Sequence, residues 1–175
     1  LAILDVAGAP AQTARMVRPG HTVVVVGGGG KSGTLCLYEA RKRAGPQACV
    51  IGISPFATDC ARMRELGWAS HALQVDATHA VAVMEAVAEA TQGHMADVTI
   101  NCVNIPHTEM SSILATRDGG RIYFFSMATS FTAAALGAEG VGKDVEMIVG
   151  NGYARGHAEH ALGLLRESPQ LRELF

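Results

Sequence analysis

The stretch Val23-Val24-Val25-Val26-Gly27-Gly28-Gly29-Gly30-Lys31-Ser32-Gly33 decides the fold. A run of four β-branched residues is typical of a strand that is buried on both faces of a parallel sheet. Glycines follow at once, and residues 34–43 then show a helical pattern with basic residues towards its end. Strand, glycine turn and helix in this order predict the first unit of an α/β domain.

The same unit recurs along the chain. Further strands are expected at residues 48–53, 71–75, 98–103, 121–125 and 146–149, and further helices at 58–66, 78–91, 108–116 and from 158 onward, with Leu171 and Leu174 extending the last helix beyond Pro169. Residues 1–17 predict one Ala-rich helix that ends at Arg18-Pro19-Gly20. Strands that alternate with helices need right-handed crossovers. We therefore expect one doubly wound, mainly parallel six-stranded sheet, a Rossmann fold, over residues 1–175.

Composition narrows the class of partner. A chain of 175 residues with 49% hydrophobic and 17% charged side chains can bury the core of one globular domain. Its 14 basic and 16 acidic residues are scattered and give a net charge of −2, so we expect no binding of nucleic acid. No run approaches the roughly 18 apolar residues of a membrane span, and we expect no membrane partner.

The cysteines indicate a reducing compartment. Cys36, Cys49, Cys60 and Cys102 show no C-x-x-C spacing, and three of them lie in apolar stretches where a free thiol packs as a small hydrophobe. We expect them to be reduced and the protein to be cytoplasmic.

The glycine turn predicts a dinucleotide site. Backbone N–H groups and the positive end of a helix attract an anion there, and glycine lets a pyrophosphate come close. Gly28, Gly30 and Gly33 match G-x-G-x-x-G, while Gly27, Gly29 and Gly33 form a second register. The candidate phosphate-binding residues are Gly28, Gly29, Gly30, Lys31, Ser32 and Gly33, with Lys31 either beside a phosphate or simply solvated.

The run Gly30-Lys31-Ser32 also suggests the phosphate loop of nucleoside triphosphatases, G-x-x-x-x-G-K-[ST]. The first glycine of that motif would fall on Val25, inside the strand, and only Asp76 and Asp97 are available as poor candidates to hold magnesium. This interpretation is disfavoured.

Cofactor choice depends on the end of the second strand. NAD sites normally carry Asp or Glu there for the adenosine ribose hydroxyls. Here the position is Ser54, followed by Pro55, and Arg62 or Arg64 lies one or two helical turns beyond. A neutral hydroxyl does not repel a 2′-phosphate, so the cofactor is NADP or NAD with a slight preference for NADP. Ser54 is equally a candidate helix cap.

Ligands of open α/β sheets bind beyond the carboxyl ends of the strands. We expect Ser54 and Asp76 at the adenine end of the site. The nicotinamide end is expected to be surrounded by Asn101-Cys102-Val103-Asn104, Ser126-Met127 and Gly150-Asn151-Gly152-Tyr153.

Catalytic residues are not identified by the sequence. His157 and His160 are spaced to share one ion, but no third ligand accompanies them, and we expect no metal site. No G-x-S-x-G elbow surrounds a serine. A complete acid/base pair is also lacking.

The chain resembles the cofactor-binding domain of the medium-chain dehydrogenase/reductase superfamily over residues 18–150. The matching pieces are Pro19 to Gly27, the glycine turn to Gly33, Glu65-Leu66-Gly67, Ala96-Asp97-Val98 and Gly119-Gly120-Arg121-Ile122. Residues 29–33, 149–153 and 156–159 resemble a branch of that superfamily that oxidatively deaminates a diamino acid in lysine fermentation.

The resemblance implies hydride transfer from an amine-bearing carbon to NAD(P), followed by hydrolysis of the imine. It implies an amine-bearing substrate and a catalytic N-terminal domain. The chain starts with Leu1, and we expect a C-terminal fragment of a longer enzyme, connected by residues 1–17, that binds cofactor without turnover. We also expect a homo-oligomer. A second interpretation is a non-catalytic Rossmann module that senses a nucleotide or supports oligomerisation.

Overall fold

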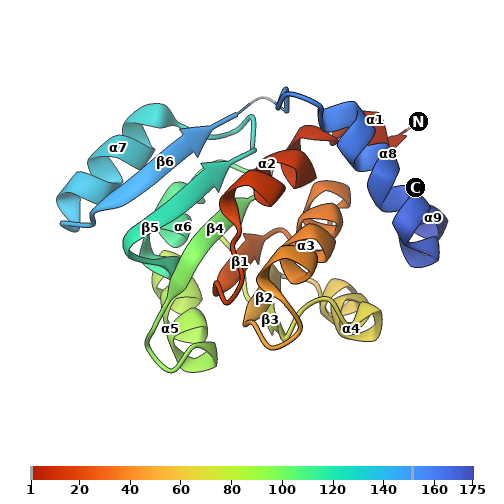
Figure 1. Cartoon of the computed structure of the whole chain (residues 1–175). Helices are drawn as coiled ribbons and strands as arrows, with labels where there is room; N and C mark the ends of the chain where they lie inside the picture. Colours follow the sequence, from red (N-terminus) through yellow and green to blue (C-terminus); the bar gives the residue numbers. More distant parts are fainter. Residues whose placement is uncertain (1, 151) are drawn as a thin grey trace.

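A computed structural model describes residues 2–150 and 152–175. Its six strands form one sheet in the order β3-β2-β1-β4-β5-β6, and every neighbouring pair is parallel (Figure 1). The strands are β1 (Val23–Val26), β2 (Val50–Ser54), β3 (His71–Gln74), β4 (Ala96–Asn101), β5 (Thr116–Phe124) and β6 (Val145–Val149). The predicted doubly wound Rossmann sheet is confirmed, because this strand order reverses direction between β1 and β4.

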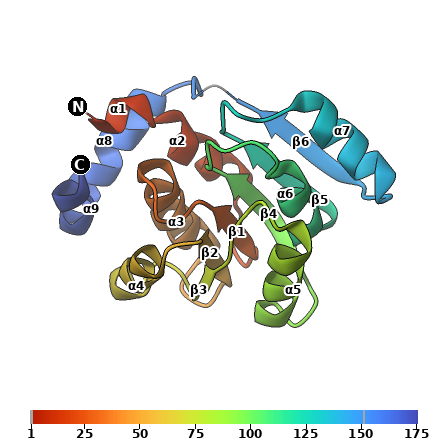
Figure 2. The same ribbon diagram turned by 180° about the vertical axis from the view of Figure 1, so that it is seen from behind.

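Helices cover both faces of the sheet. They are α1 (Ala2–Asp5), α2 (Gly8–Met16), α3 (Lys31–Ala44), α4 (Ala57–Leu66), α5 (Ala80–Ala90), α6 (Glu109–Ala115), α7 (Phe131–Gly140), α8 (His157–Glu167) and α9 (Pro169–Leu174). Helices α2, α3, α4 and α8 supply one apolar cluster, and α5, α6 and α7 line the opposite face (Figures 1 and 2). None of the described helices combines the length and apolar character needed to cross a membrane.

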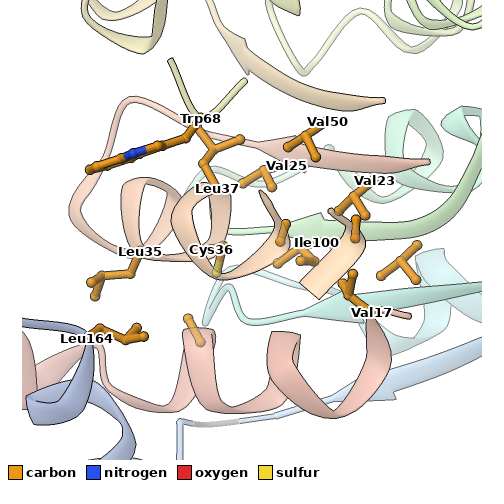
Figure 3. Packing of buried hydrophobic residues seen from close by; sticks show 14 of the residues in the cluster. Val17, Val23, Val25, Leu35, Cys36, Leu37, Val50, Trp68, Ile100 and Leu164 are labelled. Atoms are coloured by element: carbon orange, nitrogen blue, oxygen red, sulfur yellow. The ribbon is translucent and has the colours of Figure 1, made fainter. Parts of the chain in front are cut away.

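Strand β1 anchors both clusters. Its four valines are fully buried, and their side chains alternate across the sheet. Val23 and Val25 join the cluster that contains Leu35 and Ile100 (Figure 3), whereas Val24 and Val26 join the cluster on the other face. A central parallel strand therefore needs an apolar residue at every position.

The N-terminal segment differs from the prediction of one helix over residues 1–17; Leu1 lies outside the described residues. The chain forms α1 and α2 instead, separated by a turn in which the Ala9 N–H donates to the Val6 carbonyl at 3.2 Å. Pro10 cannot donate the hydrogen bond that a continuous helix would require at this point. A Cβ on Gly8 would also collide with the Gly152 backbone, so the break lets the chain pass close to the segment after β6.

Two further helix assignments need correction. Helix α7 had no predicted counterpart, because its glycines Gly137 and Gly140 and its alanines give a weak apolar period. The last helix does not continue through Pro169. Ser168 ends α8, and its Oγ accepts a hydrogen bond from the Leu171 N–H at 3.2 Å to start α9 with Pro169 in its first turn.

Asp97 ties three segments together at the edge of the sheet where the strands begin. Its carboxylate accepts hydrogen bonds from the Thr22 N–H and from Arg117 Nε, both at 2.7 Å. Burial raises the pKa of Asp97, but the bonds from Arg117 and Thr22 favour the charged form more strongly and hold the pKa below its usual value.

We predict that Asp97→Asn lowers the free energy of unfolding at pH 7 by about 1 kcal/mol. A lowered folded-state pKa adds stability above the unfolded value of about 3.9, and this contribution is lost as the pH falls through the folded value. Urea unfolding at pH 7 and at pH 3 measures the difference between wild type and variant, which should shrink at the lower pH. Asp144→Asn, at an exposed position, is the matched control. Equal losses at both pH values would contradict this account of Asp97.

Candidate cofactor site

The glycine turn joins β1 to α3 at the edge where the strands end. The N–H groups of Gly27 and Gly28 both donate to the Ile53 carbonyl, at 2.9 and 3.0 Å, so the turn is fastened to β2. Gly27 has a φ of +84°, in the left-handed region that glycine adopts without strain. The tight turn predicted between strand and helix therefore begins at Gly27.

The neighbours of each glycine distinguish their roles. A Cβ on Gly28 would lie 2.7 Å from Met63 Sδ, and one on Gly29 would collide with the Asp59 carboxylate. A Cβ on Gly33 would collide with the Gly27 carbonyl, so α3 can start this close to β1 only with glycine there. At Gly30 the nearest atom would be 3.6 Å away, an ordinary contact. The fold itself leaves room at Gly30, where a ligand can approach the backbone.

The first turn of α3 can hold an anion. Gly30 is its N-cap, and Lys31, Ser32 and Gly33 follow as the first helical residues, whose N–H groups have no acceptor within the helix. The helix dipole adds positive potential, and the Lys31 side chain is exposed beside the turn. These groups fit the pyrophosphate of a dinucleotide.

A shallow depression of about 30 Å³ lies on one side of the turn, where the adenine end was predicted. Its lining includes Gly27 and the residues expected at the adenine end, Ser54, Pro55 and Asp76. Val103, which was expected at the nicotinamide end, lines this depression instead. Asp76 Oδ1 accepts hydrogen bonds from the Thr78 N–H and hydroxyl, both at 2.8 Å. These bonds, the backbone one first, lower the pKa of Asp76.

Sequence reasoning missed an acidic neighbour of Ser54. The Ser54 hydroxyl donates to Asp59 Oδ2 at 2.7 Å, and Asp59 packs against Gly29. Arg62 bonds the Gly29 carbonyl and approaches Asp59 Oδ1 at 3.5 Å. Arg64 instead donates to the Ala72 carbonyl at 2.9 Å, so of the two arginines considered, Arg62 is the one at the turn. The signal was available: Asp59 lies in the first turn of the helix after β2.

A larger cavity of about 450 Å³ lies on the other side of the turn. Its lining includes the predicted residues Ser32, Cys102, Ser126 and Met127, together with Asn104, Gly152 and Tyr153. It also includes Leu4, Asp5, Val6 and Phe125, which the sequence did not single out, and His157, which was considered only as a metal ligand. Asn151, predicted nearby, lies outside the described residues.

Two predicted residues form hydrogen bonds within the loops that follow their strands. Asn101 is fully buried and donates to Thr108 Oγ1 at 2.9 Å and to Ser112 Oγ at 3.0 Å, while its Oδ1 accepts from the Val103 N–H. Its side chain therefore supports the loop after β4 and lines neither cavity. The Ser126 hydroxyl accepts from the Ala128 N–H at 3.1 Å, within the loop after β5.

Cys102 pairs with a second thiol. Its Sγ lies 3.8 Å from that of Cys36 on α3, and this hydrogen bond, together with burial, raises the pKa of the Cys102 thiol well above its usual range. Cys102 is therefore a neutral thiol in the cavity wall at physiological pH. Met127 is 91% exposed at the cavity rim and offers a flexible apolar surface.

The two histidines considered as metal ligands contact different groups. His157 Nδ1 bonds the Ala154 carbonyl at 2.8 Å, whereas His160 Nε2 faces Glu39 of α3 at 3.3 Å. Across residues 2–150 and 152–175, no three His, Cys, Asp or Glu side chains gather as a metal site.

We predict that Gly33→Ala and Gly30→Ala separate folding from binding. Gly33→Ala should lower the free energy of unfolding by about 2 kcal/mol, because its Cβ meets backbone that must shift. Gly30→Ala should change that energy by less than about 0.5 kcal/mol. It should nevertheless weaken dinucleotide binding about tenfold, a loss of about 1.4 kcal/mol. Chemical unfolding and calorimetric titration give the two quantities, and unchanged affinity in Gly30→Ala would contradict the assignment.

Comparison with known proteins agrees with this geometry. A family model described as zinc-binding dehydrogenase matches residues 33–150. L-erythro-3,5-diaminohexanoate dehydrogenases from Acetoanaerobium sticklandii and Fusobacterium nucleatum are 55% and 53% identical over all 175 residues. The chain spans 51% of the length of each.

A solved alcohol dehydrogenase from Aeropyrum pernix shares the fold, with a TM-score of 0.68 and 20% identity over 94% of this chain and 45% of the other. The family description mentions zinc, but the described residues do not supply its ligands. The chain belongs to the zinc-binding dehydrogenase family, and its predicted resemblance to the medium-chain dehydrogenase/reductase superfamily is confirmed.

Proposed function

We propose that the chain is the cofactor-binding half of a longer enzyme that oxidatively deaminates L-erythro-3,5-diaminohexanoate. The observation that carries the proposal is the position of the glycine turn between the shallow depression and the large cavity. Gly27 lines the depression beside Ser54, and Ser32 lines the large cavity. One extended dinucleotide would cross the turn, with its pyrophosphate at the first turn of α3 and its two bases on either side. The identity of 55% to a dehydrogenase of this substrate supports the choice of reaction.

The chain's own residues bind and orient the cofactor. The N–H groups at the start of α3 would hold the phosphates, and Cys102, Ser126 and Met127 would border the reactive ring in the large cavity. A bound nicotinamide supplies the hydride acceptor for oxidation of the amine-bearing carbon. Transfer also needs substrate held against that ring with water excluded, and we expect the other half of the enzyme to complete this enclosure.

Calorimetric titration of the 175-residue chain with NAD and NADP tests the proposal. We predict binding of at least one cofactor by wild type, weaker binding by Gly30→Ala, and no reduced cofactor when 3,5-diaminohexanoate is added. The full-length enzyme should form reduced cofactor under the same conditions. If neither cofactor binds at millimolar concentration, the proposal fails. If cofactor binds but the full-length protein has no dehydrogenase activity, the sensing module becomes the better interpretation.

We further propose that NAD is the preferred cofactor. The expectation of NADP rested on the neutral Ser54 and on an arginine, Arg62 or Arg64, beyond it. Asp59, however, brings a carboxylate to within 2.7 Å of the Ser54 hydroxyl. A carboxylate can accept hydrogen bonds from the ribose hydroxyls and repels a 2′-phosphate. Arg62 would oppose this effect, but Asp59 and the Gly29 carbonyl already engage its guanidinium.

Asp59→Asn should therefore improve the affinity for NADP relative to NAD about tenfold, or about 1.4 kcal/mol. The amide keeps the shape of the side chain and a hydrogen bond to Ser54 while removing the charge. Titrations of wild type and of the control Asp144→Asn provide the baseline. A ratio of the two affinities that does not change in Asp59→Asn would place the adenosine ribose elsewhere.

The cellular setting is proposed from the same resemblance. We assign the reaction to lysine fermentation in the cytoplasm, in agreement with the four free cysteines among the described residues. We also propose a homo-oligomer. Strand β6 is at the edge of the sheet, and Val149 on it is 46% exposed. Sedimentation of the full-length enzyme tests this, since a monomer at micromolar concentration would rule it out.

A further inference from the structure

The large cavity has an unbalanced charge. Asp5 is the one carboxylate in its lining, and no lysine or arginine of the described residues joins it. None of the ion pairs among residues 2–150 and 152–175 includes Asp5. The other titratable groups in the lining are Cys102, Tyr153 and His157. A cavity of this composition favours a cationic ligand.

His157 has a defined tautomer. Its Nδ1 lies 2.8 Å from the Ala154 carbonyl, and because a carbonyl can only accept, Nδ1 must carry the hydrogen. In the neutral ring, Nε2 is then left with a free lone pair. The His157 backbone N–H bonds the same carbonyl at 3.0 Å, and the Tyr153 ring meets the imidazole edge-on at 5.6 Å between centroids. The ring is therefore held in place in the cavity wall.

His157 is the first residue of α8, with Gly156 as N-cap. A neutral ring with a protonated Nδ1 and a free Nε2 is the form that can accept a proton.

We propose that His157 Nε2 accepts the proton of the reacting ammonium group and that Asp5 binds the second ammonium group of the diamino substrate. This inference rests on the proposed function, since it assumes a substrate with two amines. Both groups belong to this chain, from α1 and from the start of α8.

His157 Nε2 takes one proton from the ammonium and leaves a neutral amine. The C–H bond on the same carbon then breaks, its two electrons and proton leave together as hydride to oxidised nicotinamide, and the nitrogen lone pair forms the C=N bond of a protonated imine. Water adds to that carbon and passes both of its protons to the nitrogen as the C–N bond breaks, which releases ammonium and the ketone.

Steady-state kinetics of the full-length enzyme test His157. His157→Asn keeps an amide N–H that can donate to Ala154 but offers no basic nitrogen. We expect kcat for 3,5-diaminohexanoate to fall about 10²-fold to 10⁴-fold, with the dissociation constant of the cofactor within about twofold of wild type. In His157→Ala, added imidazole should restore at least a tenth of the lost rate. His94→Gln, at an exposed position after α5, is the control and should behave as wild type.

Asp5→Asn tests the second ammonium site. We expect KM for the diamino acid to rise about tenfold with kcat nearly unchanged, while KM stays the same for whichever of the monoamines 3-aminohexanoate and 5-aminohexanoate the wild-type enzyme oxidises. An equal rise for both substrates would overturn the role of Asp5. A value of kcat within about threefold of wild type in His157→Asn, or a loss of cofactor binding that parallels the loss of activity, would overturn the role of His157. A wild-type enzyme inactive on the diamino acid would instead overturn the proposed function and, with it, this inference.

Discussion

The candidate site depends on the short distance between the end of β1 and the start of α3. Gly33 lies against the Gly27 carbonyl, which brings the first turn of the helix directly under the end of the central strand. Because β1 is buried on both faces and fastened to β2 through the Ile53 carbonyl, this helix end cannot drift. The unpaired N–H groups at the start of α3 are consequently held between the shallow depression and the large cavity. A side chain at position 33 would separate helix and strand and remove the phosphate site together with the packing.

The fold could be predicted because residues close together in the sequence indicate each strand and most of the helices. The four valines of β1 could form only a central strand, and the recurring strand and helix units implied parallel pairing, which all five neighbouring strand pairs confirm. The wrong predictions were also confined to short segments of the chain. Pro10 divides the first helix in a stretch whose alanines suggested continuity, and the glycines of α7 obscured a helix whose Ala134 and Ala138 pack on the sheet.

The site could be predicted only in part, because a sequence does not show which side chains are already hydrogen-bonded to other residues of the protein. Ser54 was correctly identified as a strand end, but the carboxylate beside it comes from Asp59, five residues on and one turn into α4. Asn101 and Cys102 were both predicted from their place at the carboxyl end of a strand. The Asn101 amide, however, donates hydrogen bonds to Thr108 and Ser112. Asp5 and His157 could not be paired from sequence, since more than 150 positions separate them and only the fold brings them to one cavity.

The contact between Gly8 and Gly152 has a consequence for how the chain is made. It joins the first helices to the segment after β6, and Figure 1 shows α1 beside α8. The large cavity takes its walls from residues 4–6 and from Gly152, Tyr153 and His157 as well as from the strand ends. During synthesis the residues of the glycine turn leave the ribosome long before these last residues do. The compartment for the reactive ring can therefore close only near the end of translation.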